Sequence, residues 1–407
     1  MSSTLTKYFS PFVNHEEELC LLQIFKPFYV LLSALGLFPQ SITFPDGTYK
    51  TNVEIKNSTI NSGCTIFIFV LIHSFFVFHL QELNISSKDN VMTENKMILI
   101  SYTVALVMQI LFCSVSYFRV ICDRQIYIDV LNELADCWER SAMGKRRLIL
   151  GRLRVHVNCV ILVTVFISFL LTMLPTYIEI NLTIWKIILT ALTFHLPELV
   201  QIGMLTFYFV LVLMIVALLK NIEEELILIL QLTKNNYNDT VEVDMRMDMS
   251  EVMKVYVKTL GLKRQVNAAF QAPILVALAS SFLEIVIVPH LMYHGLAFQT
   301  NFSTQEIITC STWFLNQLLK IYALARSGEL LKSQVNEIGR TIHNIPIRGG
   351  LDSKVLLEVQ HFSSLMTYQD STITIYGYFP LDATLLFNMM ASAAMYLVIL
   401  VQFDKPE

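Results

Sequence analysis

The feature that most constrains this chain is a hydrophobic segment at residues 380–403. After Asp382 it carries no charged side chain until Asp404. A helix rises about 1.5 Å per residue, so a segment of this length crosses the roughly 30 Å hydrocarbon core of a bilayer. The segment therefore predicts a transmembrane helix.

Polar side chains in this segment recur on one helical face. Asn388, Ser392 and Tyr396 recur every four residues, and the same stripe continues through the apolar Ile399 to Phe403, with Gln402 beside its end. Lipid offers polar side chains no hydrogen-bond partners, so we expect this face of the helix to meet protein or water. Small residues at 391–394 would let a neighbouring helix approach closely, so polar contacts between packed helices are the alternative interpretation.

Six further apolar segments are long enough to span a membrane. They cover roughly residues 62–83, 97–119, 156–178, 187–219, 273–297 and 305–325. Hydrophobic residues make up 54% of the chain and charged residues 15%, which excludes a soluble domain. The sequence therefore predicts an all-α membrane protein with seven spans. We find no catalytic set, metal-ligand spacing, cofactor motif or nucleic-acid-binding pattern in it.

The spans and the segments between them divide the chain into four regions. Residues 1–61 begin with a polar, acidic stretch rather than a signal peptide. There, Lys26-Pro27 leaves only Phe28–Phe38 continuously apolar, so we expect an amphipathic or re-entrant helix at the inner surface. Residues 62–325 hold the first six spans, and 326–379 are expected to form a cytoplasmic anchor segment. Residues 380–407 hold the seventh helix and an extracellular C-terminus.

Charge placement predicts the orientation of the spans. Arginine and lysine concentrate between the second and third spans and again in residues 220–272, so both segments belong in the cytoplasm. This places the N-terminus inside and the C-terminus outside. Each of the three loops then predicted to lie outside carries a glycosylation sequon, headed by Asn84, Asn181 and Asn301. None of the seven cysteines falls in these loops, so we expect no disulfide framework.

The C-terminal sequence resembles that of a known receptor family. Tyr396, five apolar residues and Gln402-Phe403 resemble the insect gustatory receptor signature of Thr-Tyr, five hydrophobic residues and Gln-Phe, with Met395 in the threonine position. Upstream, Tyr378-Phe379, Asp382 and Leu385-Leu386 also resemble the family's aromatic, acidic and leucine positions.

The resemblance implies a tastant-gated, nonselective cation channel in the plasma membrane of chemosensory neurons. Four subunits, identical or related, would each contribute the last helix to a central pore. Cytoplasmic extensions of the later helices would form an anchor between subunits. The pore and gate residues implied are Ser392, Tyr396, Ile399, Gln402 and Phe403. The partners implied are a small tastant, the permeating cations and membrane lipid, and the sequence leaves open whether the tastant is a sugar or a bitter compound.

Polar residues in the outer halves of the later spans are candidate ligand contacts. The set is His195, Glu198 and Gln201 in the fourth span, Tyr293 in the fifth, which also carries Glu284 and His290, and Trp313, Asn316 and Gln317 in the sixth. Ionisable residues at membrane depth are costly, so they face a cavity or a partner. We prefer an aromatic-walled ligand pocket, which the resemblance also places here, and structural hydrogen-bonded networks are the alternative.

Two other classes of membrane protein are alternatives to the channel. Cys122-Asp123-Arg124 resembles the Asp-Arg motif of receptors that signal through G proteins, but it follows the second span rather than the third. A secondary transporter would show paired broken helices or internal symmetry, and the sequence shows neither.

Overall fold

The computed structural model describes residues 21–43, 54–89, 96–140, 146–178, 184–235, 249–298, 303–344, 353–369 and 371–403. These residues are almost all helical. The helices are α2 (Leu21–Ala34), α3 (Thr59–Asp89), α4 (Lys96–Cys122), α5 (Arg124–Arg140), α6 (Arg146–Ile178), α7 (Ile184–Thr190), the π-helix η3 (Ala191–His195), α8 (Leu196–Asn235), α9 (Met249–Phe298), α10 (Thr304–His343), α11 (Ser353–Tyr368) and α12 (Ala383–Phe403). Two antiparallel pairs complete the fold: β1 (Gln40–Thr43) with β2 (Glu54–Asn57), and β3 (Thr374–Ile375) with β4 (Phe379–Pro380).

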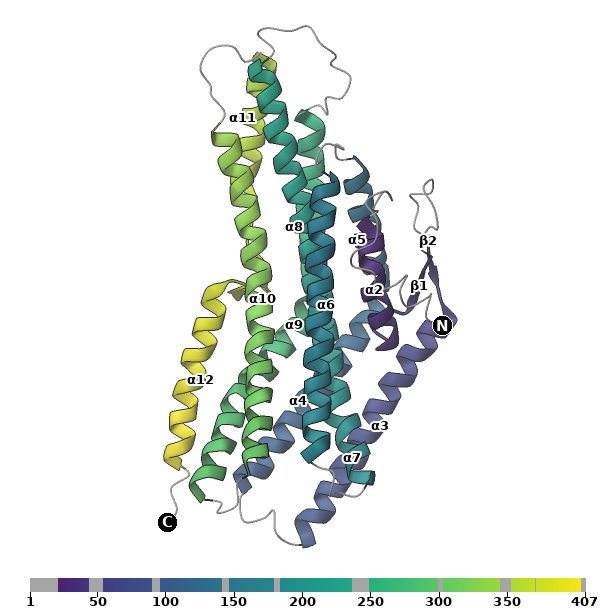
Figure 1. The fold of residues 1–407 in the computed structure, drawn as a ribbon, viewed down its shortest axis with the longest axis vertical. Helices are drawn as coiled ribbons and strands as arrows, with labels where there is room; N and C mark the ends of the chain where they lie inside the picture. Colours follow the sequence, from purple (N-terminus) through teal and green to yellow (C-terminus); the bar gives the residue numbers. More distant parts are fainter. Residues whose placement is uncertain are drawn as a thin grey trace.

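The structure confirms the all-α class and the seven-helix arrangement (Figure 1). Six helical segments in the described residues are long and apolar enough to cross a membrane. The predicted span at 305–325 is the first part of α10, which is more polar because its buried face carries Asn316, Gln317 and Lys320. The predicted span at 187–219 starts in α7, passes through η3 and continues as α8. The last span begins at Ala383 rather than at residue 380, because Phe379–Pro380 forms strand β4.

Several spans continue as long helices beyond the level of α12. In Figure 1, α8, α9 and α10 extend far past α12, toward the end opposite the C-terminus, where α11 lies beside them. Residues 222–232 and 328–340, which have helical periodicity in the sequence, lie within these extensions, since α8 runs to Asn235 and α10 to His343. That this part is a cytoplasmic anchor stays a prediction.

Helix α2 corrects one expectation about the N-terminal segment. It begins at Leu21 and runs through Pro27, so Lys26-Pro27 does not delay the helix to Phe28. Phe25 and Phe28, on either side of the proline, are fully buried, with ring centroids 5.8 and 6.1 Å from that of Phe207 in α8. Burial of these rings outweighs the one backbone hydrogen bond that a proline removes. As expected, α2 is too short to span a membrane.

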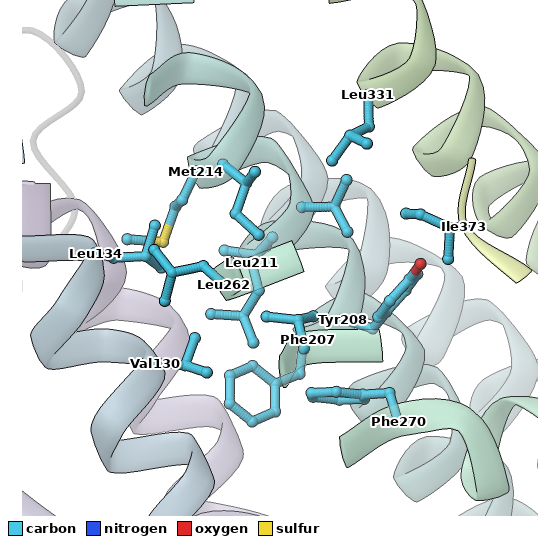
Figure 2. Packing of buried hydrophobic residues seen from close by; sticks show 14 of the residues in the cluster. Val130, Leu134, Phe207, Tyr208, Leu211, Met214, Leu262, Phe270, Leu331 and Ile373 are labelled. Atoms are coloured by element: carbon cyan, nitrogen blue, oxygen red, sulfur yellow. The ribbon is translucent and has the colours of Figure 1, made fainter. Parts of the chain in front are cut away.

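The core lies around α8. In the membrane segment Ile184–Ile229, which includes most of α8, 83% of an 18-residue hydrophobic stretch is buried inside the protein. The corresponding share in α12 is 11%. Figure 2 shows Phe207 and Tyr208 of α8 packed with Phe270 of α9, whose ring centroid lies 5.2 and 5.6 Å from theirs. The central helix therefore holds the bundle together, while α12 is attached at its edge.

The helices that flank the three predicted outside loops all end at the level of the α12 C-terminus (Figure 1). Asn84 lies in the last turns of α3, and its side chain is outside the described residues, as are Asn181 and Asn301. Because the helices that flank these three loops reach the same end of the bundle as the C-terminal end of α12, the arrangement agrees with the charge-based orientation.

This orientation makes a direct prediction. We expect an epitope fused after Glu407 to be labelled on intact cells, because the C-terminal end should face outward. An epitope placed before Met1 should be labelled only after permeabilisation, and it serves as the control for membrane integrity. The reverse labelling pattern would contradict the orientation.

Candidate functional site

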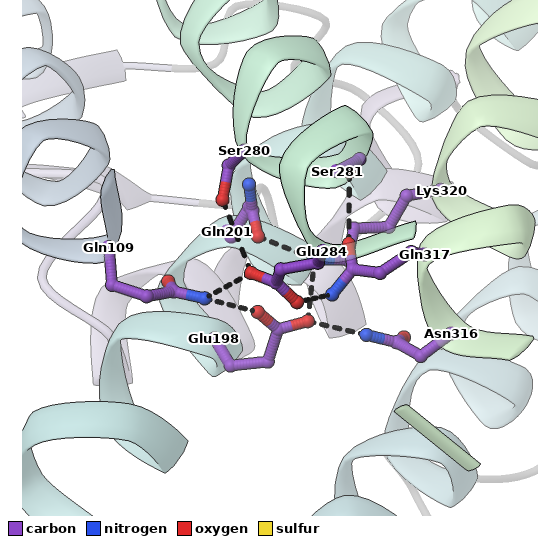
Figure 3. Close-up of polar contacts among 9 residues, drawn as sticks. All are labelled: Gln109, Glu198, Gln201, Ser280, Ser281, Glu284, Asn316, Gln317 and Lys320. Carbon is purple, nitrogen blue, oxygen red and sulfur yellow. Dashed lines mark hydrogen bonds and ion pairs between the residues drawn. The ribbon is translucent and has the colours of Figure 1, made fainter. Parts of the chain in front are cut away.

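Nine polar side chains meet inside the bundle, in the layer drawn in Figure 3. They are Gln109 of α4, Glu198 and Gln201 of α8, Ser280, Ser281 and Glu284 of α9, and Asn316, Gln317 and Lys320 of α10, and all are buried. On each of the three later helices the members are spaced so that they share one helical face. We call this set the polar network.

Glu198 is the charged centre of one half of the polar network. Lys320 Nζ lies 2.6 Å from Glu198 Oε1, which also accepts a hydrogen bond from Asn316 Nδ2 at 2.5 Å. Gln109 Nε2 donates to the other carboxylate oxygen at 3.0 Å. The ammonium of Lys320 also donates to Gln201 Oε1 at 2.5 Å. A buried carboxylate is tolerated here because it is paired and hydrogen-bonded.

Glu284 is the centre of the other half and has a different environment. Its donors within the described residues are all neutral: Gln109 Nε2 at 3.2 Å, Ser280 Oγ at 3.3 Å and the amide of Gln317. Ser281 Oγ in turn donates to Gln317 Oε1 at 2.9 Å. Because Gln109 donates to both carboxyl groups, the polar network ties α4, α8, α9 and α10 together at one level.

A second polar and aromatic group lies one turn farther out, at η3. Pro197 has no N–H to donate to Thr193, and the N–H of Leu196 bonds to the carbonyl of Ala191, five residues back. This local sequence explains the π-helical turn. Such turns frequently occur at functional sites because they redirect side chains.

The π-turn presents two polar side chains to neighbouring helices. Thr193 Oγ1 lies 2.8 Å from His79 Nδ1 of α3, and Tyr102 of α4 lies 2.9 Å from the other ring nitrogen of His79. His195 stacks on Trp313 of α10, with ring centroids 6.2 Å apart. Its Nδ1 is buried and has no hydrogen-bond partner in the part of the chain described. An available polar atom beside an aromatic face is the combination that small-molecule sites use.

The sequence-predicted ligand contacts thus fall into two layers. Glu198, Gln201, Asn316 and Gln317 belong to the polar network, whereas His195 and Trp313 pair in the layer outside it. Tyr293 lies nine positions beyond Glu284 on α9, and 39% of it is exposed. Structural hydrogen bonds and a candidate ligand site are therefore neighbouring features, rather than exclusive interpretations of the same residues.

The prediction missed several members of both layers. Lys320 and Gln109 were not singled out, although each is a polar residue inside a predicted span, which is the signal that would have found them. His79, Tyr102 and Thr193 were also missed. Their contacts join three helices that are far apart in the sequence, and no spacing pattern shows them.

One face of helix α12 packs against the bundle, and the opposite face is not covered by the described residues of the chain. Leu385 and Ala393 are buried on the side that packs against α9 and α10, whereas Asn388, Ser392, Ile399 and Gln402 are exposed. Tyr396 lies at the boundary, 55% exposed, with its ring centroid 5.8 Å from that of Phe282. The side chain of Phe403 lies outside the described residues. Of the stripe predicted from the sequence, Asn388, Ser392, Ile399 and the adjacent Gln402 are therefore on the uncovered face.

Comparison with known proteins adds a family and a fold. Residues 25–407 match the family model described as 7tm chemosensory receptor. The chain is 23% identical over 177 residues to Gustatory receptor 68a of Drosophila melanogaster, covering 42% of this chain and 44% of that receptor. It is 28% identical over 102 residues to Gustatory and pheromone receptor 39a, isoform A, of the same species, covering 25% and 26%. The chain thus matches less than half the length of these two relatives.

Solved structures resemble the whole bundle. The insect olfactory receptor OR5 from Machilis hrabei superposes with a TM-score of 0.72 at 14% identity, covering 94% of this chain and 99% of that one. The same receptor in complex with eugenol gives a TM-score of 0.69 over the same shares of the two chains. At this identity the likeness shows a shared fold.

Proposed function

The chain belongs to the 7tm chemosensory receptor family, and from this premise we propose that it is an insect gustatory receptor whose tastant opens a nonselective cation channel built from several copies of the chain. It spans the membrane of the cell many times and is a receptor rather than an enzyme. In the proposal the membrane is the plasma membrane of a chemosensory neuron, and the outer loops are glycosylated at Asn84, Asn181 and Asn301.

The uncovered face of α12 is the observation that carries the channel proposal. Asn388, Ser392 and Gln402 are exposed there, in a helix long and apolar enough to span the membrane. Lipid offers these polar groups no hydrogen bonds, whereas a water-filled conduit does. One helix cannot enclose a conduit, so the same face of other copies must complete it. We propose four copies around a central axis, with Ser392 and Tyr396 along the conduit and Ile399, Gln402 and Phe403 at its outer gate.

The layer outside the polar network is the proposed ligand site. His195 offers an unpartnered ring nitrogen beside the aromatic face of Trp313, and Tyr293 lies farther out on α9. The members of the polar network predicted as ligand contacts, Glu198, Gln201, Asn316 and Gln317, would form its polar floor. The ligand would be a sugar or a bitter compound.

Recording current tests the proposal as a whole. Cells expressing this chain alone are exposed to D-fructose, sucrose, caffeine, denatonium and eugenol, and we expect at least one to evoke a cation current. A receptor that signals through a G protein, or a secondary transporter, would give no channel current when purified and reconstituted alone. Absence of current with surface expression intact would overturn the proposed function.

Trp313 provides a more local prediction. Trp313→Ala removes the aromatic face on which His195 stacks, so the concentration of agonist for half-maximal current should rise roughly tenfold, which corresponds to about 1.4 kcal/mol of binding free energy. Trp185→Ala is the matched control, because Trp185 is 49% exposed on α7 and lies outside both polar layers. An unchanged dose response in Trp313→Ala, at normal surface expression, would remove Trp313 from the ligand site.

A further inference from the structure

Helix α12 is joined to the bundle by a tight hairpin at its inner end. Thr374 pairs with Pro380 and Ile375 with Phe379, and the N–H of Tyr378 bonds to the carbonyl of Ile375 at 3.0 Å. Three residues, Tyr376, Gly377 and Tyr378, lie between the paired Ile375 and Phe379, and the first two have φ of 50° and 74°. Both values lie in the left-handed region, which glycine adopts without strain.

Helix α9 holds this hairpin by its backbone. Lys263 Nζ donates to the carbonyl of Thr372 at 3.0 Å, and Asn267 Nδ2 donates to the carbonyl of Thr374 at 2.9 Å. The two donors are four positions apart and so lie on one helical face. Ile373, Ile375 and Leu381 of the hairpin segment are buried as well. The inner end of α12 is therefore fixed to the bundle by both polar and apolar contacts.

Helix α10 touches the same segment at a glycine. A Cβ atom built on Gly328 would overlap the carbonyl oxygen of Leu381 and would lie 2.9 Å from its carbonyl carbon. Both are backbone atoms, so no side-chain rotation relieves the overlap. Leu381 comes two residues before α12, whose first turn is capped by Asp382 Oδ1 accepting from the N–H of Thr384 at 2.9 Å. Only glycine lets the α10 backbone approach the start of α12 this closely.

Helix α10 also carries part of the candidate ligand site, closer to its first residue than Gly328 is. Trp313 of the outer layer, Lys320 of the polar network and Gly328 at the hairpin all lie on α10, which is one continuous helix from Thr304 to His343. Lys320 and Gly328 are eight residues apart, or about 12 Å along the axis. Because the helix is continuous between Trp313 and Gly328, it is the physical connection through which a displacement at one residue is transmitted to the other. Toward the outer end of α12 one face is exposed. The ring of Tyr396 in this part makes an edge-to-face contact with Phe282 of α9.

We infer that Gly328 and Leu381 form the joint through which movement of α10 tilts α12 and so opens the conduit. The inference rests on the proposed channel function. Gly328 is a positioning residue in this account: it touches neither ligand nor ion, and it sets where the pore-lining helix begins. The hairpin held by Lys263 and Asn267 keeps the inner end in place, so the tilt is expressed at the outer end of α12.

Gly328→Ala tests the joint, with Gly339→Ala as its matched control. Gly339 lies on the same helix, and a Cβ there would meet only the terminal methyl of Met366, at 3.5 Å, which is an ordinary contact. The two variants change helix propensity alike, so they differ in the contact with Leu381. The agonist is the member of the tastant panel that opens the wild-type channel. We expect Gly328→Ala to reduce the maximal agonist-evoked current at least tenfold while the agonist still shifts the melting temperature of the solubilised protein as in wild type. Gly339→Ala should behave as wild type in both assays.

The possible results separate the joint from the channel proposal. A silent wild-type protein would overturn the channel proposal and the joint that rests on it. A conducting wild type with Gly328→Ala equal to Gly339→Ala would overturn the joint alone. If Gly328→Ala does not reach the surface, Asn267→Ala replaces it, since it removes one hold on the hairpin without adding bulk, with the exposed Asn132→Ala as control. Asn267→Ala should then reduce the maximal current while the agonist still shifts the melting temperature. Equal currents in Asn267→Ala and Asn132→Ala would contradict the joint.

Discussion

Replacing Lys320 with methionine should destabilise the bundle by roughly 3–5 kcal/mol, because the change leaves the buried carboxylate of Glu198 without its cation. The side chains of the pair are 5% and 1% exposed, and their charged atoms are 2.6 Å apart. The loss is measured as the free energy of unfolding in detergent, by titration with a denaturing detergent. Lys254→Met is the matched control, because Lys254 is an exposed lysine on the neighbouring helix α9.

A second substitution tests whether the loss comes from the unpaired charge. Lys320→Met combined with Glu198→Gln removes both charges, and the glutamine side chain keeps the size of the glutamate and one acceptor oxygen for the neighbouring amides. Replacing both members of a buried pair is often nearly neutral, so the double variant should recover most of the stability lost in Lys320→Met. A double variant less stable than Lys320→Met, or a single variant no worse than Lys254→Met, would contradict the ion pair as the reason for the burial of Lys320.

Gln402→Lys should reduce the cation current at least tenfold if α12 lines the conduit. Gln402 is exposed on the uncovered face of α12, and each copy of the chain would contribute one such side chain near the outer gate. A ring of ammonium groups repels cations at a constriction, whereas a ring of carboxylates attracts them. Gln402→Glu should therefore strengthen the preference for cations or introduce block by divalent ions. Gln402→Asn keeps a neutral amide and is the control for the change in side chain.

Hydropathy predicted the membrane helices well because a bilayer imposes a fixed minimum length on an apolar helix. The sixth span is the instructive case. Its predicted start at residue 305 agrees with the start of α10 at Thr304. Lys320 makes this helix more polar than the other spans, and the structure shows that the lysine has a buried carboxylate as its partner.

Most of the contacts between helices could not be predicted from the sequence. Gln109 and Glu284 are 175 positions apart, and each polar group is compatible with many partners until the bundle brings two of them together. The start of α2 was predicted too late, because a proline's effect on a helix depends on the burial of its neighbours, here Phe25 and Phe28. The hairpin before α12 was not predicted, since its strands have two residues each and are held by side chains of α9.

The stripe on α12 is a pattern in the sequence, and the structure adds which of its members the rest of the chain leaves uncovered. Asn388, Ser392, Ile399 and Gln402 are left uncovered by the rest of the chain, while Tyr396 leans toward α9. Periodicity alone could not separate a face that meets other helices of the same chain from one that the chain leaves free. That distinction decides whether the polar residues serve internal packing or an assembly of several copies.

Single-channel recording from the purified protein, reconstituted alone in lipid bilayers, tests the central claim most directly. The account predicts unitary cation currents evoked by the agonist, with lower conductance in Gln402→Lys and altered cation preference or divalent block in Gln402→Glu. Conductance and selectivity identical to wild type in both variants would remove Gln402 from the conduit. The absence of any unitary current from correctly assembled protein would contradict the channel itself.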